Sequence, residues 1–153
     1  MDAIAEKRPR IGFCCGAFDL LHAGHVLMLE DARRQCDVLV VGLHVDPSIE
    51  RPNKNAPIQS LDERAIQLAA VRYVDRIAIY HTEADLVELL KELRPDVRVL
   101  GSDWMERAHT GRELQIPIYY HKRNHPWSTS DLRKRVYEAE KAKKAGDNGS
   151  NVL

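Results

Sequence analysis

The chain has no excess of charge of either sign and no long apolar run. Its 153 residues carry 23 lysines and arginines against 23 aspartates and glutamates, so no overall field attracts nucleic acid. No apolar run approaches the roughly 20 residues of a membrane-spanning helix, and the N-terminus lacks a signal-peptide pattern. We therefore predict no nucleic-acid partner, no membrane insertion and a cytoplasmic protein.

Cysteines are scarce as well. Cys14, Cys15 and Cys36 form neither a CxxC pair nor the spacing of a disulfide framework, so we expect reduced thiols in or near the core. Hydrophobic residues make up 44% of the chain, an ordinary value for a globular domain with its own core. We predict a flexible leader at 1–9, one folded domain at 10–146 and a disordered tail at 147–153.

Short apolar runs alternate with helical patterns through the predicted domain. Strands are expected at 11–15, 37–43, 76–80, 97–100 and 116–120. Helices are expected at 23–36, 60–72, 85–93 and from 129 to the mid-140s, the second opened by the capping-box pattern Ser60-x-x-Glu63. The fold class is therefore α/β: a single-domain, Rossmann-like, doubly wound parallel five-stranded sheet with helices on both faces.

The segment 16–25, Gly-Ala-Phe-Asp-Leu-Leu-His-Ala-Gly-His, stands where the first strand passes into the first helix. Gly16 and Gly24 permit close approach of the backbone, and His22 and His25 share one face of the first helical turn. A helix N-terminus offers unpaired N–H groups and a positive dipole end, which favour phosphate. Two histidines on one turn also suit zinc, but no further Cys or His cluster has a recognisable ligand spacing. The pattern therefore favours phosphate chemistry.

Residues 16–25 resemble the G-[TCA]-F-D-x-x-H-x-G-H signature of the cytidylyltransferase-like nucleotidyltransferases. Within this superfamily the chain is most similar to the small bacterial glycerol-3-phosphate cytidylyltransferases. Further segments of the family follow in the expected order, at 60–64, 72–75, 101–104 and 123–130. The first segment, 16–25, and two of the further ones, 101–104 and 123–130, each follow a predicted strand. These three are therefore expected to converge on the carboxyl edge of the sheet, where such folds bind ligands.

The resemblance implies roles for individual residues. His22 and His25 would donate hydrogen bonds to the α-phosphate, Lys54 would close over the other phosphates or the acceptor, and Arg123 would clamp the triphosphate. The nucleotide would contact Gly16, Ala17, Phe18, Gly24, Asp103, Trp104, Trp127, Ser128, Thr129 and Ser130, with Ala17 and Phe18 acting through their main chain.

Three further residues have other expected roles. Asp19 is expected to orient its loop through hydrogen bonds to backbone amides. Arg64 and Arg72 are either solvated arginines or contacts to the acceptor or the triphosphate, and both interpretations stay open.

The chain departs from the family pattern at two places. Ala17 stands where many relatives have threonine, which removes a hydroxyl that could touch phosphate. Asn124-His125-Pro126-Trp127 stands where the family usually has Thr-Glu-Gly-Ile. Pro126 fixes φ and removes an N–H donor where glycine was permissive, so the preference for the base is open.

The resemblance implies transfer of CMP from CTP to a small phosphorylated alcohol, with glycerol 3-phosphate as the leading acceptor and pyrophosphate as the leaving group. It also implies a homodimer, and Mg²⁺ bound mainly through the nucleotide phosphates with no assigned protein ligand. The alternatives are an adenylyltransferase acting on a sugar phosphate or FMN, and a cytidylyltransferase for another phosphate acceptor. A non-catalytic nucleotide-binding protein is a third possibility, but it needs fewer of the residues His22, His25, Lys54 and Arg123.

Overall fold

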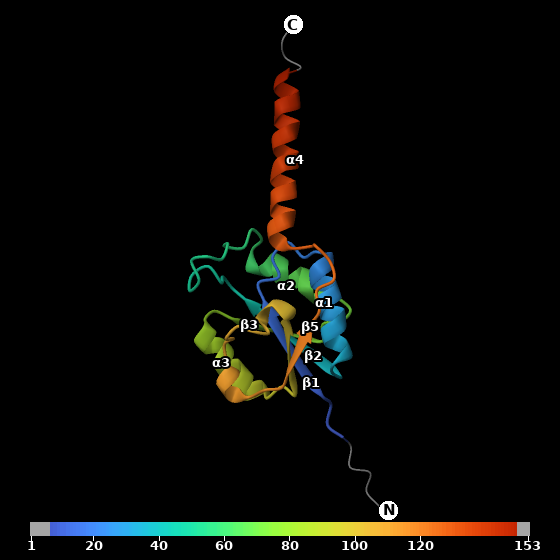
Figure 1. Ribbon diagram of the computed structural model, residues 1–153, viewed down its shortest axis with the longest axis vertical. Helices are drawn as coiled ribbons and strands as arrows, with labels where there is room; N and C mark the ends of the chain where they lie inside the picture. Colours follow the sequence, from blue (N-terminus) through green and yellow to red (C-terminus); the bar gives the residue numbers. More distant parts are fainter. Residues whose placement is uncertain (1–6, 150–153) are drawn as a thin grey trace, which may run out of the picture.

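The apolar runs of the sequence form one parallel sheet in the computed structural model, which describes residues 7–149 (Figure 1). The strands are β1 (Ile11–Gly16), β2 (Val38–His44), β3 (Arg76–Tyr80), β4 (Val97–Gly101) and β5 (Ile118–His121). The helices are α1 (Ala23–Arg34), α2 (Leu61–Ala69), α3 (Glu83–Leu93) and α4 (Thr129–Gly149), with short 3₁₀ turns η1 (Ser102–Trp104) and η2 (Arg112–Leu114).

The strand order β3-β2-β1-β4-β5 confirms the predicted Rossmann-like sheet. Every pairing is parallel, and Phe13 of β1 lies opposite Arg98 of β4. The chain winds from β1 outward through β2 and β3, then returns to the other side of β1 for β4 and β5. The switch point therefore lies between β1 and β4, and a ligand crevice is expected at the carboxyl ends of these two strands.

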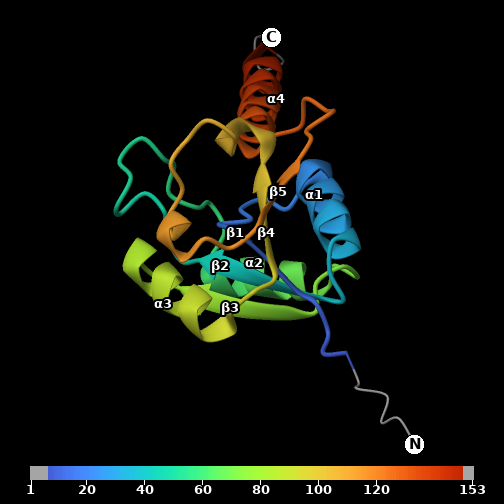
Figure 2. The ribbon, with the colours of Figure 1, turned by 60° about the horizontal axis from the view of Figure 1, so that its bottom comes forward.

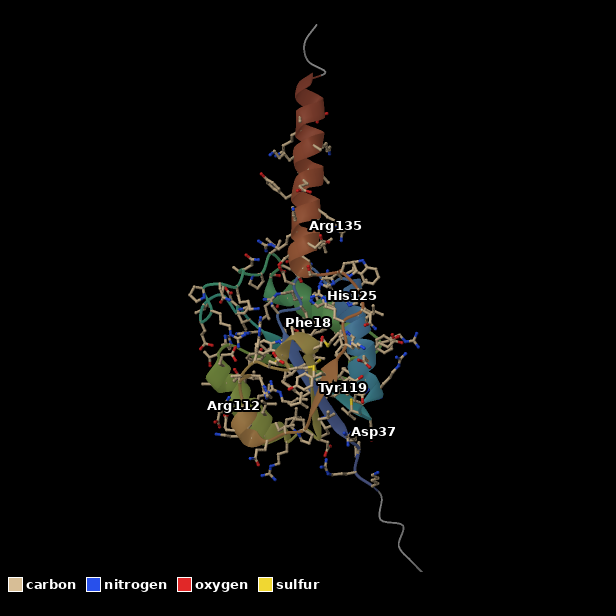
Figure 3. All side chains as sticks on the ribbon, in the orientation of Figure 1. Phe18, Asp37, Arg112, Tyr119, His125 and Arg135 are labelled. Atoms are coloured by element: carbon tan, nitrogen blue, oxygen red, sulfur yellow. The ribbon has the colours of Figure 1, made fainter. Side chains whose placement is uncertain are left out.

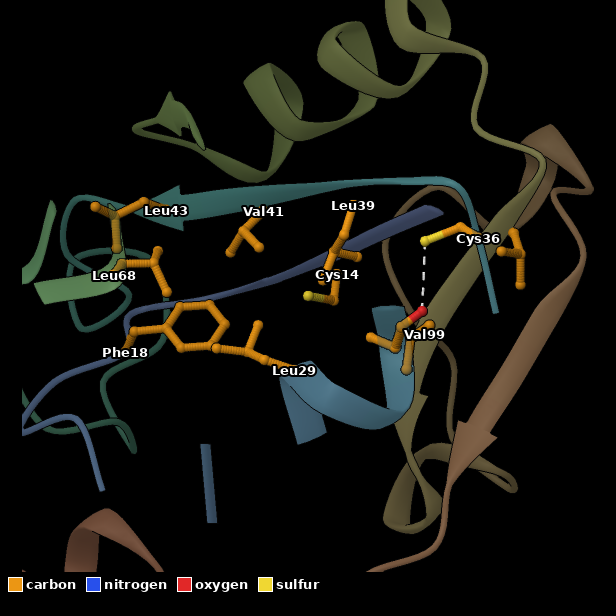
Figure 4. Close-up of a cluster of buried hydrophobic side chains, with 11 residues drawn as sticks. Cys14, Phe18, Leu29, Cys36, Leu39, Val41, Leu43, Leu68 and Val99 are labelled. Atoms are coloured by element: carbon orange, nitrogen blue, oxygen red, sulfur yellow. Dashed lines mark hydrogen bonds between the residues drawn. The ribbon is translucent and has the colours of Figure 1, made fainter. Parts of the chain in front are cut away.

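Both faces of the sheet are covered by helices (Figure 2). One buried cluster contains Leu29 of α1 and Leu68 of α2 with Cys14 and Val41 of the sheet (Figure 4). The other contains Leu86 and Leu90 of α3 with strand residues. The three cysteines are free thiols, as predicted, and burial raises the pKa of each of them.

Side-chain caps fix where the helices begin. The predicted capping box of α2 is formed, with the Ser60 hydroxyl accepting from Glu63 N at 3.2 Å and Ser60 N donating to the Glu63 carboxylate at 2.7 Å. Helix α3 begins two residues earlier than expected because Thr82 caps it, its hydroxyl accepting from Asp85 N at 3.0 Å. Strand β5 begins at Ile118 and not at 116, since Pro117 lacks an N–H donor for the ladder.

The two ends of the domain differ from the prediction. Arg8, placed in the flexible leader, forms an ion pair with Asp96 at 2.7 Å, whereas residues 1–6 lie outside the described part. Helix α4 runs to Gly149 and so includes the first three residues of the predicted tail, because its last turns follow a run of alanine, lysine and glutamate, which are good helix formers. Residues 150–153 lie outside the described part.

Helix α4 projects away from the sheet (Figure 1), and beyond its first turn its side chains are largely exposed. Over residues 7–149, no helix is both long enough and apolar enough to cross a membrane.

Candidate active site

Two adjoining cavities, each of about 360 Å³, open at the carboxyl edge of the sheet around the switch point. The wall between them contains the five residues that line both, which are Cys15, His25, Leu100, Trp104 and Thr129. Most predicted site residues line one or both cavities. The first cavity is lined by Gly16, Ala17, Phe18, Asp19, His25, Lys54, Trp104, Thr129 and Ser130, among others. The second is lined by His22, Gly24, His25, Asp103, Trp104, Arg123, Trp127, Ser128 and Thr129, among others.

His22 joins the N-termini of two helices. It is the N-cap of α1, and its Nδ1 accepts from Gly24 N at 3.0 Å. Because Nδ1 accepts, the ring proton sits on Nε2, which donates to the Thr129 hydroxyl at 3.2 Å, at the start of α4. Ser128 caps α4 in turn, its hydroxyl accepting from Asp131 N at 3.1 Å. The positive ends of α1 and α4 thus converge at one point, which favours an anion.

His25 completes the cap of α1 from the third helical position. Its Nδ1 accepts from His22 N at 3.4 Å, and the two imidazoles stack with centroids 3.8 Å apart. The Nε2–H of His25 therefore remains as a donor in the wall between the cavities. Gly24 permits this packing, since a Cβ there would lie 2.9 Å from His22 Cε1 and 2.8 Å from His125 Cε1. The histidine pair is thus both a helix cap and a set of donors.

Both imidazoles are neutral at neutral pH. Burial, with a smaller contribution from the neighbouring His22, lowers the pKa of His25 to about 3, although Asp19 opposes the shift. Burial also lowers the pKa of His22, with smaller contributions from His125 and Arg123. A neutral imidazole donates from Nε2 and leaves Nδ1 free to accept, which is the arrangement that the cap of α1 requires.

Stability is expected to fall when the pH drops below 6.5. The pKa of His25 is lower in the folded chain than in the unfolded chain, so the unfolded chain binds more protons between pH 6.5 and pH 3. His25 thus destabilises the fold in this window, by at most about 1.4 kcal/mol per pH unit. Urea denaturation at pH 7 and pH 5 measures the effect. His25→Asn, whose amide oxygen can replace Nδ1 as an acceptor, should show a smaller loss, and an equal loss would contradict the assignment.

The loop after β1 is held in an uncommon backbone conformation. Phe18 and Leu20 have φ of 48° and 49°, in the left-handed region that non-glycine residues rarely adopt. Phe18 is buried in the core, and Leu20 N donates to Gln59 Oε1 at 2.7 Å. The Asp19 carboxylate accepts from Ile58 N and Gln59 N, both at 2.9 Å. Asp19 thus binds backbone amides, as expected. These amides belong not to its own loop but to the 45–60 loop, which carries Lys54.

Arg64 does not line either cavity, so its proposed contact to acceptor or triphosphate is corrected. Its side chain is buried, with 2% of the residue exposed, and all three of its nitrogens donate to backbone carbonyls. The acceptors are the carbonyl oxygens of Ala17, His44, Val45, Gln59 and Ser60, at 2.7–3.3 Å. Its role is to hold the loops that follow β1 and β2. Arg72 is exposed, lies 5.5 Å over the ring of Tyr73 and reaches neither cavity.

The 123–127 segment, which departs from the family pattern, forms one side of the second cavity. Arg123 donates to Trp127 O at 2.7 Å and so closes the segment on itself. The rings of His125 and Trp127 stack with centroids 5.1 Å apart, and 43% of Trp127 is exposed. His125 lies beside the base of α4 (Figure 3), and neither of its ring nitrogens has a partner among the described residues. The stacked rings offer a platform for a base.

Several residues of the cavities were not predicted. His121 lines the second cavity and pairs through Nδ1 with Asp31 at 2.7 Å, an acid on α1 that also accepts from the Tyr119 hydroxyl. Arg51 pairs with Glu83 at 2.7 Å in the first cavity. These pairs join distant parts of the chain, so no local spacing reveals them. Arg98 did leave a signal, since it interrupts the short apolar run at 97–100 that was predicted to be a strand.

One group of metal-ligating types occurs within the described range, formed by His44, Glu50 and Glu83. Its acids already have partners, because Glu83 pairs with Arg51 and Glu50 accepts from Glu83 N at 2.8 Å. The second cavity contains a carboxylate from Asp103. This fits an ion held mainly by nucleotide phosphates, to which the protein adds few ligands.

The parallel sheet, the switch-point cavities and the converging helix ends define a Rossmann-like α/β domain with a site that favours anions. Comparison with known proteins agrees. The chain belongs to the cytidylyltransferase-like family, whose pattern it matches over residues 13–135. The bifunctional protein HldE of Aliarcobacter butzleri is 37% identical over 146 residues, covering 92% of this chain and 30% of that protein. HldE of Acidiphilium cryptum is 45% identical over 112 residues, covering 72% of this chain and 23% of that protein.

This chain therefore spans less than a third of the length of these relatives. Among solved structures, the lipopolysaccharide core biosynthesis protein from Thermoplasma volcanium superposes with a TM-score of 0.60 at 27% identity, covering 74% of this chain and 95% of that one. A pantoate-beta-alanine ligase from Francisella tularensis, with a TM-score of 0.56 at 18% identity, shares the fold.

Proposed function

We propose that the protein is a nucleotidyltransferase that moves AMP from ATP to a sugar phosphate and releases pyrophosphate. The observation that carries the proposal is the pair of neutral histidines, with His25 in the wall between the two cavities and His22 in the second cavity beside it. We assign the second cavity to the nucleotide and the first to the acceptor. Similarity to HldE proteins over up to 92% of the chain supports the adenylyltransferase alternative over transfer of CMP to glycerol 3-phosphate.

Two observations support a sugar as acceptor. The first cavity, of about 360 Å³, is large for a three-carbon acceptor, and its polar groups include His44, His109 and Thr110. A structural neighbour is named for lipopolysaccharide core biosynthesis, and core oligosaccharides are made from activated sugars.

In the reaction, an oxygen of the acceptor phosphate attacks the α-phosphorus of the nucleotide. The bond from that phosphorus to the bridging oxygen of the β-phosphate breaks, and pyrophosphate leaves with the electron pair. The acceptor phosphate is already anionic, so no general base is needed. The chain supplies positioning and charge stabilisation instead: His25 Nε2–H donates to the α-phosphate, and the starts of α1 and α4 hold the triphosphate.

Other groups complete the proposed site. Lys54, which forms no ion pair with the described residues, is available to the phosphates from the 45–60 loop, and Arg123 to the triphosphate. We also propose that Mg²⁺ would neutralise charge on the triphosphate, and Asp103 is a carboxylate of the second cavity that could contribute to holding it. We also propose that the protein is a homodimer, and light scattering tests this by measuring the molar mass in solution.

Pyrophosphate release tests the function. With Mg²⁺ present, ATP and CTP are each combined with heptose 1-phosphate, mannose 1-phosphate, glycerol 3-phosphate and FMN. We expect release with ATP and a sugar phosphate to exceed any other combination by at least about tenfold, a margin that one unpaired hydrogen bond in a specific site produces. Release with CTP and glycerol 3-phosphate would support the cytidylyltransferase instead. Nucleotide binding without release would support a non-catalytic protein.

A further inference from the structure

Arg98, on β4, is a buried cation with few partners. Only 2% of the residue is exposed, its Nη1 donates to Thr110 O at 2.5 Å, and its Nε has no partner among the described residues. No described carboxylate forms an ion pair with it. Because arginine stays charged in proteins and a buried charge without a partner is costly, this guanidinium needs an anion.

Arg64 shows what a structural arginine looks like in the same molecule. Both arginines are 2% exposed, but Arg64 donates to five backbone carbonyls whereas Arg98 donates to one. The acid next to Arg98 in the cavity wall, Glu83, does not supply the missing partner. One of its oxygens pairs with Arg51 at 2.7 Å and the other accepts from the Thr110 hydroxyl. The hydrogen-bonding capacity of Arg98 is thus left for a ligand.

Arg98 lies in the wall of the first cavity and away from the second. Its neighbours there, His109 and Thr110, also line the first cavity only. Leu100, two residues further along the same face of β4, lines both cavities, and its Cα stands about 7 Å from that of Arg98 along the strand. The Arg98 side chain also interacts with the Cys15 thiol, which belongs to the shared wall. Transfer must occur at the shared wall, where the two substrates meet. Because Arg98 lines the acceptor's cavity alone, an anion at Arg98 would belong to the acceptor and can be a group other than the phosphate that reacts.

We propose that the acceptor carries a second anionic group, a carboxylate or a phosphate, and that Arg98 binds it at the far end of the first cavity. This inference rests on the proposed function and narrows its substrate class from sugar phosphates in general to those with two separate anionic groups, which are called doubly anionic below. The reacting phosphate lies near His25, with Lys54 and Arg133 as the cations around it. The second group takes no part in bond making or breaking and sets the position and identity of the acceptor.

Matched pairs of probes test the inference without nucleotide, by calorimetric titration of the full chain. The pairs are 3-phosphoglycerate against glycerol 3-phosphate, and glucose 1,6-bisphosphate against glucose 1-phosphate. Within at least one pair, we expect the doubly anionic member to bind at least about tenfold more tightly. The pair that discriminates shows whether the second group is a carboxylate or a phosphate. Similar affinities within both pairs, or no binding of either doubly anionic probe, would overturn the inference.

Substitution of Arg98 separates a binding role from a structural one. Arg98→Met should bring the affinity ratio within the discriminating pair close to one, while the melting temperature stays the same or rises, since a costly buried charge is removed. Arg34→Met, an exposed arginine on α1, is the matched control and should keep the ratio. An unchanged ratio, with a lower melting temperature, would assign Arg98 to the fold alone.

The outcomes for the inference and for the proposed function are distinguishable. Suppose that Arg98→Met abolishes the affinity ratio within the discriminating pair, and that the protein releases no pyrophosphate with any acceptor. This result supports the anion subsite and rejects the transferase. Pyrophosphate release from singly anionic sugar phosphates, with a ratio near one, supports the transferase and rejects the subsite.

Discussion

Replacing His25 by asparagine is expected to lower kcat for pyrophosphate release by about 10²- to 10³-fold, because a donor to the charge that develops on the α-phosphate is lost. His22→Asn should lower the rate too, since its Nε2–H holds Thr129 at the start of α4. Asparagine can retain the accepting role of each Nδ1 in the cap of α1, so both variants are expected to fold.

Steady-state pyrophosphate release with saturating nucleotide measures these losses. His81→Asn is the matched control, because its side chain is exposed and lines neither cavity. Circular dichroism should show the same helical content for all three variants. Near-normal turnover in both His22→Asn and His25→Asn would refute a role of the pair in the chemistry.

Replacing Arg64 by methionine is expected to destabilise the chain by about 3 kcal/mol, since it leaves buried carbonyls without a donor. The loops after β1 and β2 both depend on this guanidinium, which binds Ala17 O at 3.0 Å and His44 O at 2.7 Å. Activity should fall as well, because these loops line the first cavity. Urea denaturation gives the free energy of unfolding of both proteins.

Arg72→Met is the control for Arg64, eight positions along the chain and exposed to solvent. Its expected effect is within about 0.5 kcal/mol. If Arg64→Met unfolds at the same urea concentration as the wild type, the guanidinium does not hold the loops.

The sheet and its helices followed from the sequence because they depend on local periodicity and capping. The strand at Arg76–Tyr80 and the cap at Ser60 illustrate this, since a short apolar run and a three-residue spacing are visible without tertiary structure. Boundaries differed where a single residue decides them. Thr82 moved the start of α3, and Pro117 moved the start of β5.

The candidate site was also predicted from the sequence only in part. Residues 16–25 and 123–130 were placed correctly at one edge, because each follows a strand of a parallel sheet. The role of Arg64 could not be predicted, since its five acceptors come from three separate segments that only the folded chain brings together. The Asp31–His121 pair joins α1 to β5 for the same reason.

His22 and His25 have both a structural and a chemical role, which limits how the sequence of this domain can change during evolution. His22 and His25 also cap α1, so a substitution that alters the chemistry risks the folding of α1 unless, like asparagine, it keeps an acceptor for the cap. Arg98 has few internal partners, the Thr110 carbonyl and the Cys15 thiol, and most changes there should leave the fold intact. Single substitutions at Arg98 can therefore change which acceptor is bound without loss of the fold. Substitutions of His22 and His25, in contrast, affect both the reaction and the stability of α1. A lineage of such domains would be expected to exchange acceptors readily and to lose its two histidines last.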